Sequence, residues 1–152
     1  MKQRKLSPSA FFLLTFGLGI ILTYFYPLYI TVYLDDTLVR SIGLLSLFVS
    51  LMLNIFAYKK FKGAKTSHAP FTRPRLLIKN GIFSLSRNPV YLALVLSECG
   101  LAFVFDTLWL MITAVLLLIF LDLFIVRDEE KLLESLFSDE YKVYKKNTRR
   151  WL

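Results

Sequence analysis

The sequence predicts an all-α, polytopic integral membrane protein with four transmembrane helices and a cytoplasmic amphipathic C-terminal helix. Of its 152 residues, 56% are hydrophobic and 20% are charged, and the mean hydropathy is +0.56. Charged side chains are absent from residues 6–34 and from residues 41–58. About 20 apolar helical residues cross a hydrocarbon core of roughly 30 Å, so these stretches predict membrane spans. This composition excludes a disordered chain, a disulfide-rich secreted scaffold and a soluble enzyme.

The chain is expected to form one membrane domain over residues 1–152. The predicted spans cover residues 10–32, 38–58, 89–105 and 107–126, with a cytoplasmic loop at 61–87 and a C-terminal helix at 127–150. The first span is not expected to be a removable signal peptide, because its apolar run is too long and no small-residue cleavage site follows it. Pro27 is expected to kink the first helix, which neighbouring helices can absorb.

The distribution of basic residues orients these spans. Of the 19 Lys and Arg residues, three precede the first span, eight lie within 59–87 and seven lie within 127–150. Only Arg40 belongs to a loop on the opposite side. The positive-inside rule therefore places both termini in the cytoplasm. The net charge of +8 is accordingly interpreted as a topology signal with a secondary attraction to membrane lipids, and nucleic acid is not expected as a partner.

Metal chemistry has no support in the sequence. Cys99 is the only cysteine, so it can form no internal disulfide and gives no metal-ligand spacing. His68 is the only histidine and lies in a polar loop, where a solvated side chain is the default interpretation. No metal ligand is therefore assigned.

Polar residues at the membrane boundary leave several alternatives open. Three consecutive acids, 128–130, follow the last span, against the positive-inside trend. These acids could be solvated, could stabilise the start of a helix by their charge, or could pair with basic residues such as Lys79 or Arg87. Alternatively, one of the glutamates could face inward and hold a cation. Downstream, apolar residues recur at three- and four-residue spacing, which predicts a helix lying on the membrane interface. They are Leu132, Leu133, Leu136, Phe137, Tyr141 and Tyr144.

The start of the third span has a plain structural interpretation. Pro89 suits the first turn of a helix, and Asn88 before it suits an N-cap. Within the spans, Glu98 and Asp122 are costly and are functional candidates for that reason. Asp122 could snorkel or pair with Arg127. Glu98 could form a hydrogen bond between helices or act near a substrate.

Three segments in this order resemble one known superfamily. The first is the loop at 66–70 leading into 77–83, and the second is SRNPVYL at 86–92, which resembles an R-H/N-P-x-Y-L signature. The third is the tail, with EEKLL at 129–133, Phe137, Glu140, Tyr141, Tyr144 and RRWL at 149–152. Over about residues 65–152 the chain is similar to the isoprenylcysteine carboxyl methyltransferase and phospholipid N-methyltransferase superfamily. Ser138 stands where this tail usually has glycine, and Asn88 where the prenylcysteine branch has histidine.

The resemblance implies a membrane-embedded methyltransferase that uses S-adenosyl-L-methionine. A carboxylate at Glu129 suits the ammonium of this cofactor, and Phe83 suits its adenine. Glu130 would support Glu129. The cofactor-binding residues that the resemblance implies are His68, Arg75, Leu76, Leu77, Ile78, Phe83, Asn88, Pro89, Tyr91, Glu129 and Glu130.

The implied reaction is methyl transfer to a lipophilic acceptor at the cytoplasmic membrane face, as in isoprenylcysteine carboxyl methyltransferases. Arg87, Arg149 and Arg150 are candidates for orienting an anionic acceptor, and Glu98 for reaching an acceptor that arrives from the lipid. An amine or phenol acceptor would in addition require a general base. Two alternatives stay open: a phospholipid or other lipid amine, hydroxyl or thiol as acceptor, and a non-catalytic membrane subunit that retains the fold.

Overall fold

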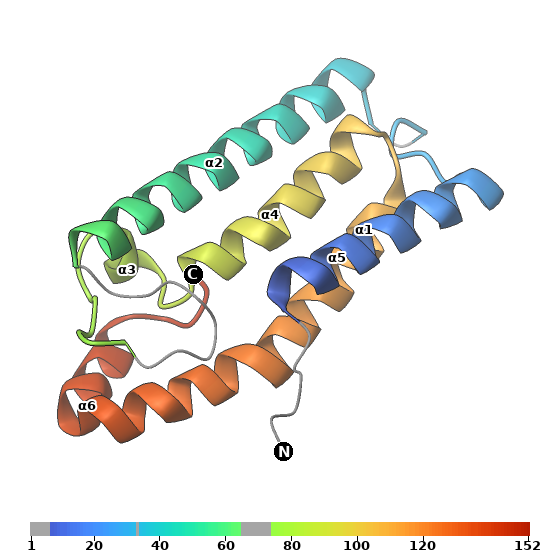
Figure 1. Ribbon diagram of the computed structural model, residues 1–152. Helices are drawn as coiled ribbons and strands as arrows, with labels where there is room; N and C mark the ends of the chain where they lie inside the picture. The colour runs from blue at the N-terminus through green and yellow to red at the C-terminus, as the bar shows by residue number, and fades with distance from the viewer. Residues whose placement is uncertain (1–6, 33, 65–73) are drawn as a thin grey trace.

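The computed structural model describes residues 7–32, 34–64 and 74–152, and within these residues it contains helices and no strands (Figure 1). The elements in order are α1 (Pro8–Phe25), α2 (Asp36–Gly63), α3 (Ile82–Leu85), α4 (Pro89–Val104), α5 (Leu108–Phe120), the π-helical turn η1 (Leu121–Val126) and α6 (Arg127–Asn147). The helices α5, η1 and α6 follow one another without an intervening loop.

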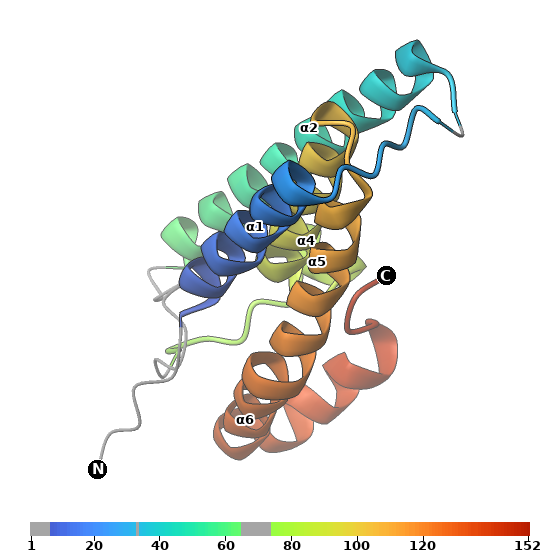
Figure 2. The same cartoon turned by 90° about the vertical axis from the view of Figure 1, so that its right-hand side faces the viewer.

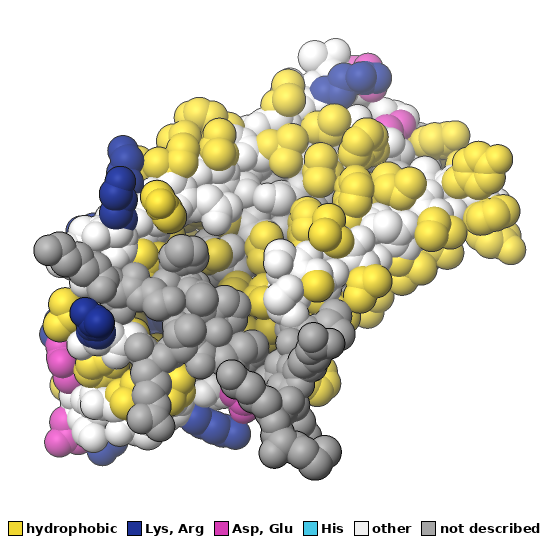
Figure 3. Space-filling view, viewed as in Figure 1, with side chains coloured by type: hydrophobic (Ala, Val, Ile, Leu, Met, Phe, Trp, Pro, Cys, Tyr) yellow, Lys and Arg dark blue, Asp and Glu magenta, His cyan; other side chains and the backbone are white. Residues whose placement is uncertain are grey.

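Three helical segments of the described chain are long and apolar enough to cross a membrane. They are Pro8–Phe25, Asp36–Gly63 and the continuous segment Leu108–Asn147. The helix α4 is apolar but shorter. Large hydrophobic side chains are exposed over α1, α2, α5 and η1, and the space-filling view shows hydrophobic surface across the bundle with charged groups toward its ends (Figure 3).

The helix α4 lies between α2 and α5, and α1 packs along α5 (Figures 1 and 2). Small residues bring α2 and α4 together: a Cβ on Gly43 would lie 3.0 Å from the carbonyl oxygen of Gly100, and one on Gly100 would lie 3.1 Å from that of Gly43. Lipid tails are as apolar as the helices, so the hydrophobic effect does not drive helices together within a membrane. Close packing of backbones at small residues is a common alternative there.

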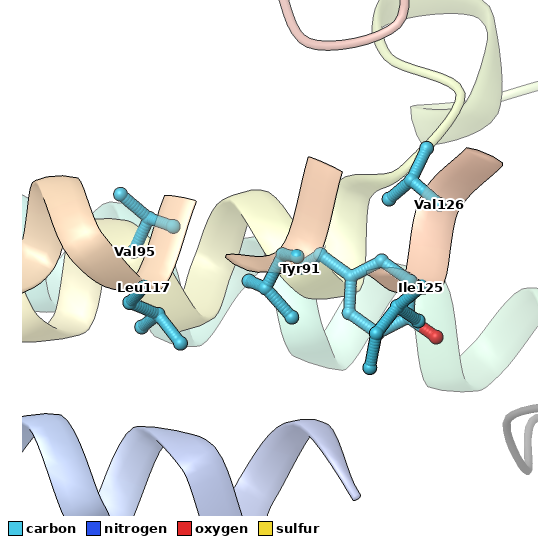
Figure 4. Close-up of a cluster of buried hydrophobic side chains, with 6 residues drawn as sticks. Tyr91, Val95, Leu117, Ile125 and Val126 are labelled. Carbon is cyan, nitrogen blue, oxygen red and sulfur yellow. The ribbon is translucent and has the colours of Figure 1, made fainter. Parts of the chain in front are cut away.

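The main hydrophobic cluster joins α4 to α5 and η1. It consists of Tyr91, Val95, Leu117, Leu121, Ile125 and Val126. Figure 4 shows Tyr91 of α4 beside Ile125 of η1, with Val95 and Leu117 further along the same interface. The cluster therefore fixes the first turns of α4 against the π-helical turn that leads into α6.

Three helix ends differ from the sequence-based expectation. The helix α1 ends at Phe25 and not at residue 32, because Pro27 restricts the residue before it and cannot donate a backbone hydrogen bond. The helix α2 continues to Gly63, past residue 58. The helix α6 ends at Asn147 and not at residue 150, and it is interrupted at Ser138, whose φ is 41° and ψ is −112°.

Residues 148–152 turn back toward the start of α4 (Figure 1). The amide nitrogen of Arg87 donates to the carbonyl oxygen of Arg149 at 3.0 Å. The Oγ of Ser86 and the Nδ2 of Asn88 both donate to the carbonyl oxygen of Arg150, at 3.2 and 3.1 Å. The end of the chain is thus fastened to the segment that precedes α4.

Candidate functional site

The acidic residues 128–130 occupy the first turn of α6, directly after the π-helical turn η1. Single π-helical turns inside α-helices occur frequently at functional sites. Successive residues of an α-helix point about 100° apart, so Glu129 and Glu130 face different neighbours. One of them faces α4, and the other faces the C-terminal tail.

Glu129 is joined to the first turn of α4. The phenol oxygen of Tyr91 donates to Glu129 Oε1 at 2.7 Å. The Tyr91 side chain is buried in the cluster of Figure 4, so its position is set by packing. A hydrogen bond to a carboxylate is stronger than one between neutral groups. The structure therefore brings together the Asn-Pro-x-Tyr segment and the glutamate pair, which lie far apart in the sequence.

Glu130 lies between two arginines. Arg87 Nη2 is 2.9 Å from Glu130 Oε1, and both side chains are only 8% exposed. Arg150 adds two hydrogen bonds, from Nε to Oε1 at 3.1 Å and from Nη2 to Oε2 at 2.8 Å. The hydrogen bonds to Glu130 raise the pKa of Arg150 further above its usual range, so this guanidinium is charged at any physiological pH. For Glu130, the structure therefore contains the pairing with Arg87 that was one of the alternatives for the acidic cluster.

Asp122 is a second anchor for the tail. Its Oδ1 accepts from Arg150 Nη1 at 3.0 Å and from Trp151 Nε1 at 3.2 Å, and its Oδ2 accepts from Arg127 Nε at 3.3 Å. The pairing with Arg127 was among the sequence-based alternatives. The contacts with Arg150 and Trp151 were missed, because no spacing along the chain indicates that the tail turns back.

Asn88 stands at the N-cap position of α4, but its side chain makes no capping hydrogen bond. The expected N-cap position of Asn88 is confirmed, but the amide nitrogen of its side chain donates to the carbonyl oxygen of Arg150 and does not cap the helix. Pro89 occupies the first turn of α4, as expected.

The described part of the expected loop lies between the ends of α2 and α6. Phe83 is buried, and its ring centre is 5.3 Å from that of Phe61. The phenol of Tyr144 donates to the carbonyl oxygen of Phe83 at 2.6 Å; burial raises the pKa of Tyr144 to about 12, so this donor is neutral at physiological pH. Leu77 and Ile78 are half-buried, whereas Arg75 and Leu76 are exposed. His68 lies outside the described residues.

Of the residues expected on the acceptor side, Arg87 and Arg150 meet at Glu130, whereas Glu98 and Arg149 lie apart from them. Arg87 is buried against Glu130. Glu98 is 0% exposed and accepts from Thr15 Oγ1 of α1 at 3.0 Å, about 10 Å along α4 from Tyr91. Arg149 is exposed on the tail, and its Nη1 donates to the carbonyl oxygen of Leu152 at 3.5 Å.

The assembled arrangement places the carboxylate of Glu129 beside Tyr91, and a carboxylate is the kind of group that forms charge-assisted hydrogen bonds with a cationic ligand. In the part of the chain that the structure describes, no group of three or more His, Cys, Asp or Glu residues can hold a metal ion. The buried ion pairs around Glu130 fix the surroundings of Glu129.

In a comparison with models of protein families, residues 38–140 match a family described as phospholipid methyltransferase. The matched region runs from α2 into α6 and includes Tyr91, Glu129 and Glu130. No curated protein and no solved structure matches the chain.

Proposed function

Because the chain belongs to the phospholipid methyltransferase family, within the superfamily of membrane methyltransferases, we propose that it transfers a methyl group from S-adenosyl-L-methionine to a lipid at the cytoplasmic face of a membrane. The observation that carries this proposal beyond the family is the hydrogen bond between Tyr91 and Glu129. It joins the two motifs at the end of the bundle that carries most of the basic residues.

In the proposed frame, α1, α2, α4 and the α5–η1 segment all cross the membrane as one domain, with both termini cytoplasmic. The helix α4 has 16 residues, a length of about 24 Å, which is shorter than a hydrocarbon core of roughly 30 Å. Its packing between α2 and α5 supports a spanning role, since neighbouring helices shield its ends from lipid. The helix α6 then lies at the cytoplasmic interface.

The residues present suit the cofactor, which supplies an activated methyl group on a sulfonium. In this proposal Glu129 binds the cofactor ammonium, and Tyr91 holds that carboxylate in place through its hydrogen bond. The apolar residues Leu77, Ile78 and Phe83 provide the wall for adenine. The remaining residues of the proposed set are His68, Arg75, Leu76, Asn88 and Pro89. Glu130, with its two arginines, supports the start of α6 and so the position of Glu129.

Methyl transfer requires no covalent bond to the protein. The task of the side chains is to align the acceptor with the methyl group and to exclude water. We place Glu98 outside this site: its bond with Thr15 connects α4 to α1 inside the bundle, and this favours the structural alternative for that residue. Arg149, on the exposed tail, is available only to a group at the surface.

A carboxylate acceptor, as in isoprenylcysteine carboxyl methyltransferases, is the second candidate. Arg87 carries the observation that favours it, because its Nε and Nη1 are buried and have no partner in the described part of the chain. Two such donors suit an oxyanion. Both nitrogens are buried, however, so an acceptor would reach them only if the tail moved. The family description favours a phospholipid.

Transfer of a radiolabelled methyl group tests the proposal. Detergent-purified protein receives labelled S-adenosyl-L-methionine with either phosphatidylethanolamine or a prenylated cysteine, and the lipid phase is counted. We expect label in the phospholipid, loss of that label on Glu129→Gln, and retention on Glu134→Gln, a matched change on the same helix. Label in the prenylated cysteine alone would support the second candidate. Cofactor binding without transfer would refute both acceptors, and absence of binding by folded protein would favour a non-catalytic subunit.

A further inference from the structure

A groove of about 700 Å³ opens between the end of α2 and the segment before α3. Its apolar lining includes Phe56, Leu76, Leu77, Ile78 and Ile82, and its charged lining consists of Lys59, Lys60 and Lys79. None of the described residues that line it is a carboxylate. The groove therefore combines an apolar wall with three cations.

The length of α2 indicates the level of this groove relative to the membrane. The helix has 28 residues, about 42 Å, whereas a hydrocarbon core is roughly 30 Å thick. The apolar part of the helix ends near Tyr58, and Lys59, Lys60 and Lys62 follow. Phe56 consequently lies at the edge of the hydrocarbon, and the lysines lie at the level of the headgroups. Figure 3 shows basic side chains at this end of the molecule, at the edge of the hydrophobic surface of the bundle.

The three lysines are held differently. Lys60 Nζ donates to Asn80 Oδ1 at 3.2 Å, and its stem passes over Gly81, where φ is +67° and a Cβ would lie 2.5 Å from Lys60 Cε. Lys79 Nζ is 2.8 Å from Glu140 Oε1, in a pair whose side chains are about half exposed. Lys59 is exposed and has no partner among the described residues. Among the described residues, a carboxylate therefore offsets Lys79 but neither Lys59 nor Lys60.

We propose that this groove binds the headgroup of an anionic phospholipid of the cytoplasmic leaflet, with its phosphate between Lys59 and Lys60 and the start of an acyl chain along Phe56. The charge balance selects this occupant, because a zwitterionic headgroup would bring its own cation toward the lysines. Anionic lipids dominate the surface potential of a cytoplasmic leaflet and attract basic segments there. The inference goes beyond methyl transfer but rests on the proposed function for the cytoplasmic placement of this end of the bundle. The groove shares Leu76, Leu77 and Ile78 with the residues proposed for the cofactor.

Native mass spectrometry of the detergent-purified full chain tests this site directly. The protein is titrated with phosphatidylglycerol and, separately, with phosphatidylcholine. We expect preferential retention of phosphatidylglycerol, weakened about fivefold by Lys59→Gln and further by Lys59→Gln with Lys60→Gln. Lys59 is exposed and has no partner among the described residues, so its replacement should leave folding intact. Lys62→Gln is the matched control, because it removes the same charge from the same turn but does not line the groove.

A gain-of-binding variant strengthens the test. Glu140→Gln removes the carboxylate that competes for Lys79, so it should tighten binding of phosphatidylglycerol by a few-fold. Equal retention of phosphatidylcholine would overturn the proposal, and so would equal weakening by Lys62→Gln, which would indicate diffuse attraction. Displacement of the lipid by inorganic phosphate at the same concentration would also overturn it, since the apolar wall would then contribute nothing.

Discussion

Arg150 holds Glu130 through two hydrogen bonds, Nε to Oε1 at 3.1 Å and Nη2 to Oε2 at 2.8 Å. One residue lies two positions from the end of the chain, and the other lies in the first turn of α6. Arg87, just before α4, adds a third contact to the same carboxylate. The end of the chain thereby fixes α6 relative to α4, and with them the two elements that carry Glu129 and Tyr91.

Replacing Glu130 should destabilise the protein strongly. Glu130→Gln removes the charge that compensates the buried Arg87 and the half-buried Arg150. Loss of one partner of a buried ion pair typically costs about 3 kcal/mol or more. Unfolding in detergent, followed by circular dichroism, should show this loss, whereas Glu134→Gln should change stability by about 0.5 kcal/mol or less. Equal stability of the two variants would contradict the role given to the tail.

Replacing Ser138 by glycine should stabilise the protein. Its φ of 41° lies in the region where a side chain is strained and glycine is not. Ser138→Gly is expected to raise stability by about 1 kcal/mol. Ser135→Gly, within the regular part of α6, should lower it by about 1 kcal/mol. A loss of stability in both variants would show that Ser138 is not strained.

Acid should weaken the turn between α4 and α5. Partial burial raises the pKa of Asp106, but hydrogen bonds from Thr31 and Ile30 outweigh this effect, so the pKa lies below the usual aspartate value. A lowered folded-state pKa contributes stability above the unfolded value and loses it as pH falls through the folded value. The melting temperature should therefore fall more between pH 5 and about pH 3 in the parent than in Asp106→Asn. Parallel pH profiles would refute this contribution.

Glu98→Gln should leave methyl transfer unchanged. The amide oxygen can still accept from Thr15, so the link between α4 and α1 persists. A general base at this position would instead make the variant slower by about 100-fold or more. Glu98→Leu is the companion variant: it removes the acceptor and should cost about 1 kcal/mol of stability. Loss of activity in Glu98→Gln with unchanged stability would return Glu98 to the reacting site.

Much of the fold could be predicted because membrane insertion acts on local composition. The long apolar runs and the clustered lysines predict helices at nearly the positions of α2, α4 and α5. The early end of α1 was harder to predict from the sequence. Pro27 predicts only a kink, whereas the segment after it is held in a non-helical form because Asp106 accepts hydrogen bonds from the backbone nitrogens of Ile30 and Thr31. That contact joins residues from distant parts of the chain.

The candidate site divides in the same way. The motifs around Tyr91 and Glu129 indicated which segments meet, and the structure joins them. The roles of Asn88 and Arg87 were harder to predict, because both depend on a tail that turns back after Asn147. The backbone at Ser138 has a positive φ. This conformation suits the glycine that the resembled motif usually has at this position.

Binding of S-adenosyl-L-methionine, measured by calorimetry on the detergent-purified protein, tests the central claim most directly. The parent should bind the cofactor, and Glu129→Gln should lose about 2–5 kcal/mol of binding free energy, because one charge-assisted contact is removed. Tyr91→Phe should weaken binding less, and Glu134→Gln should bind like the parent. Parent-like binding by a folded Glu129→Gln variant would contradict the account.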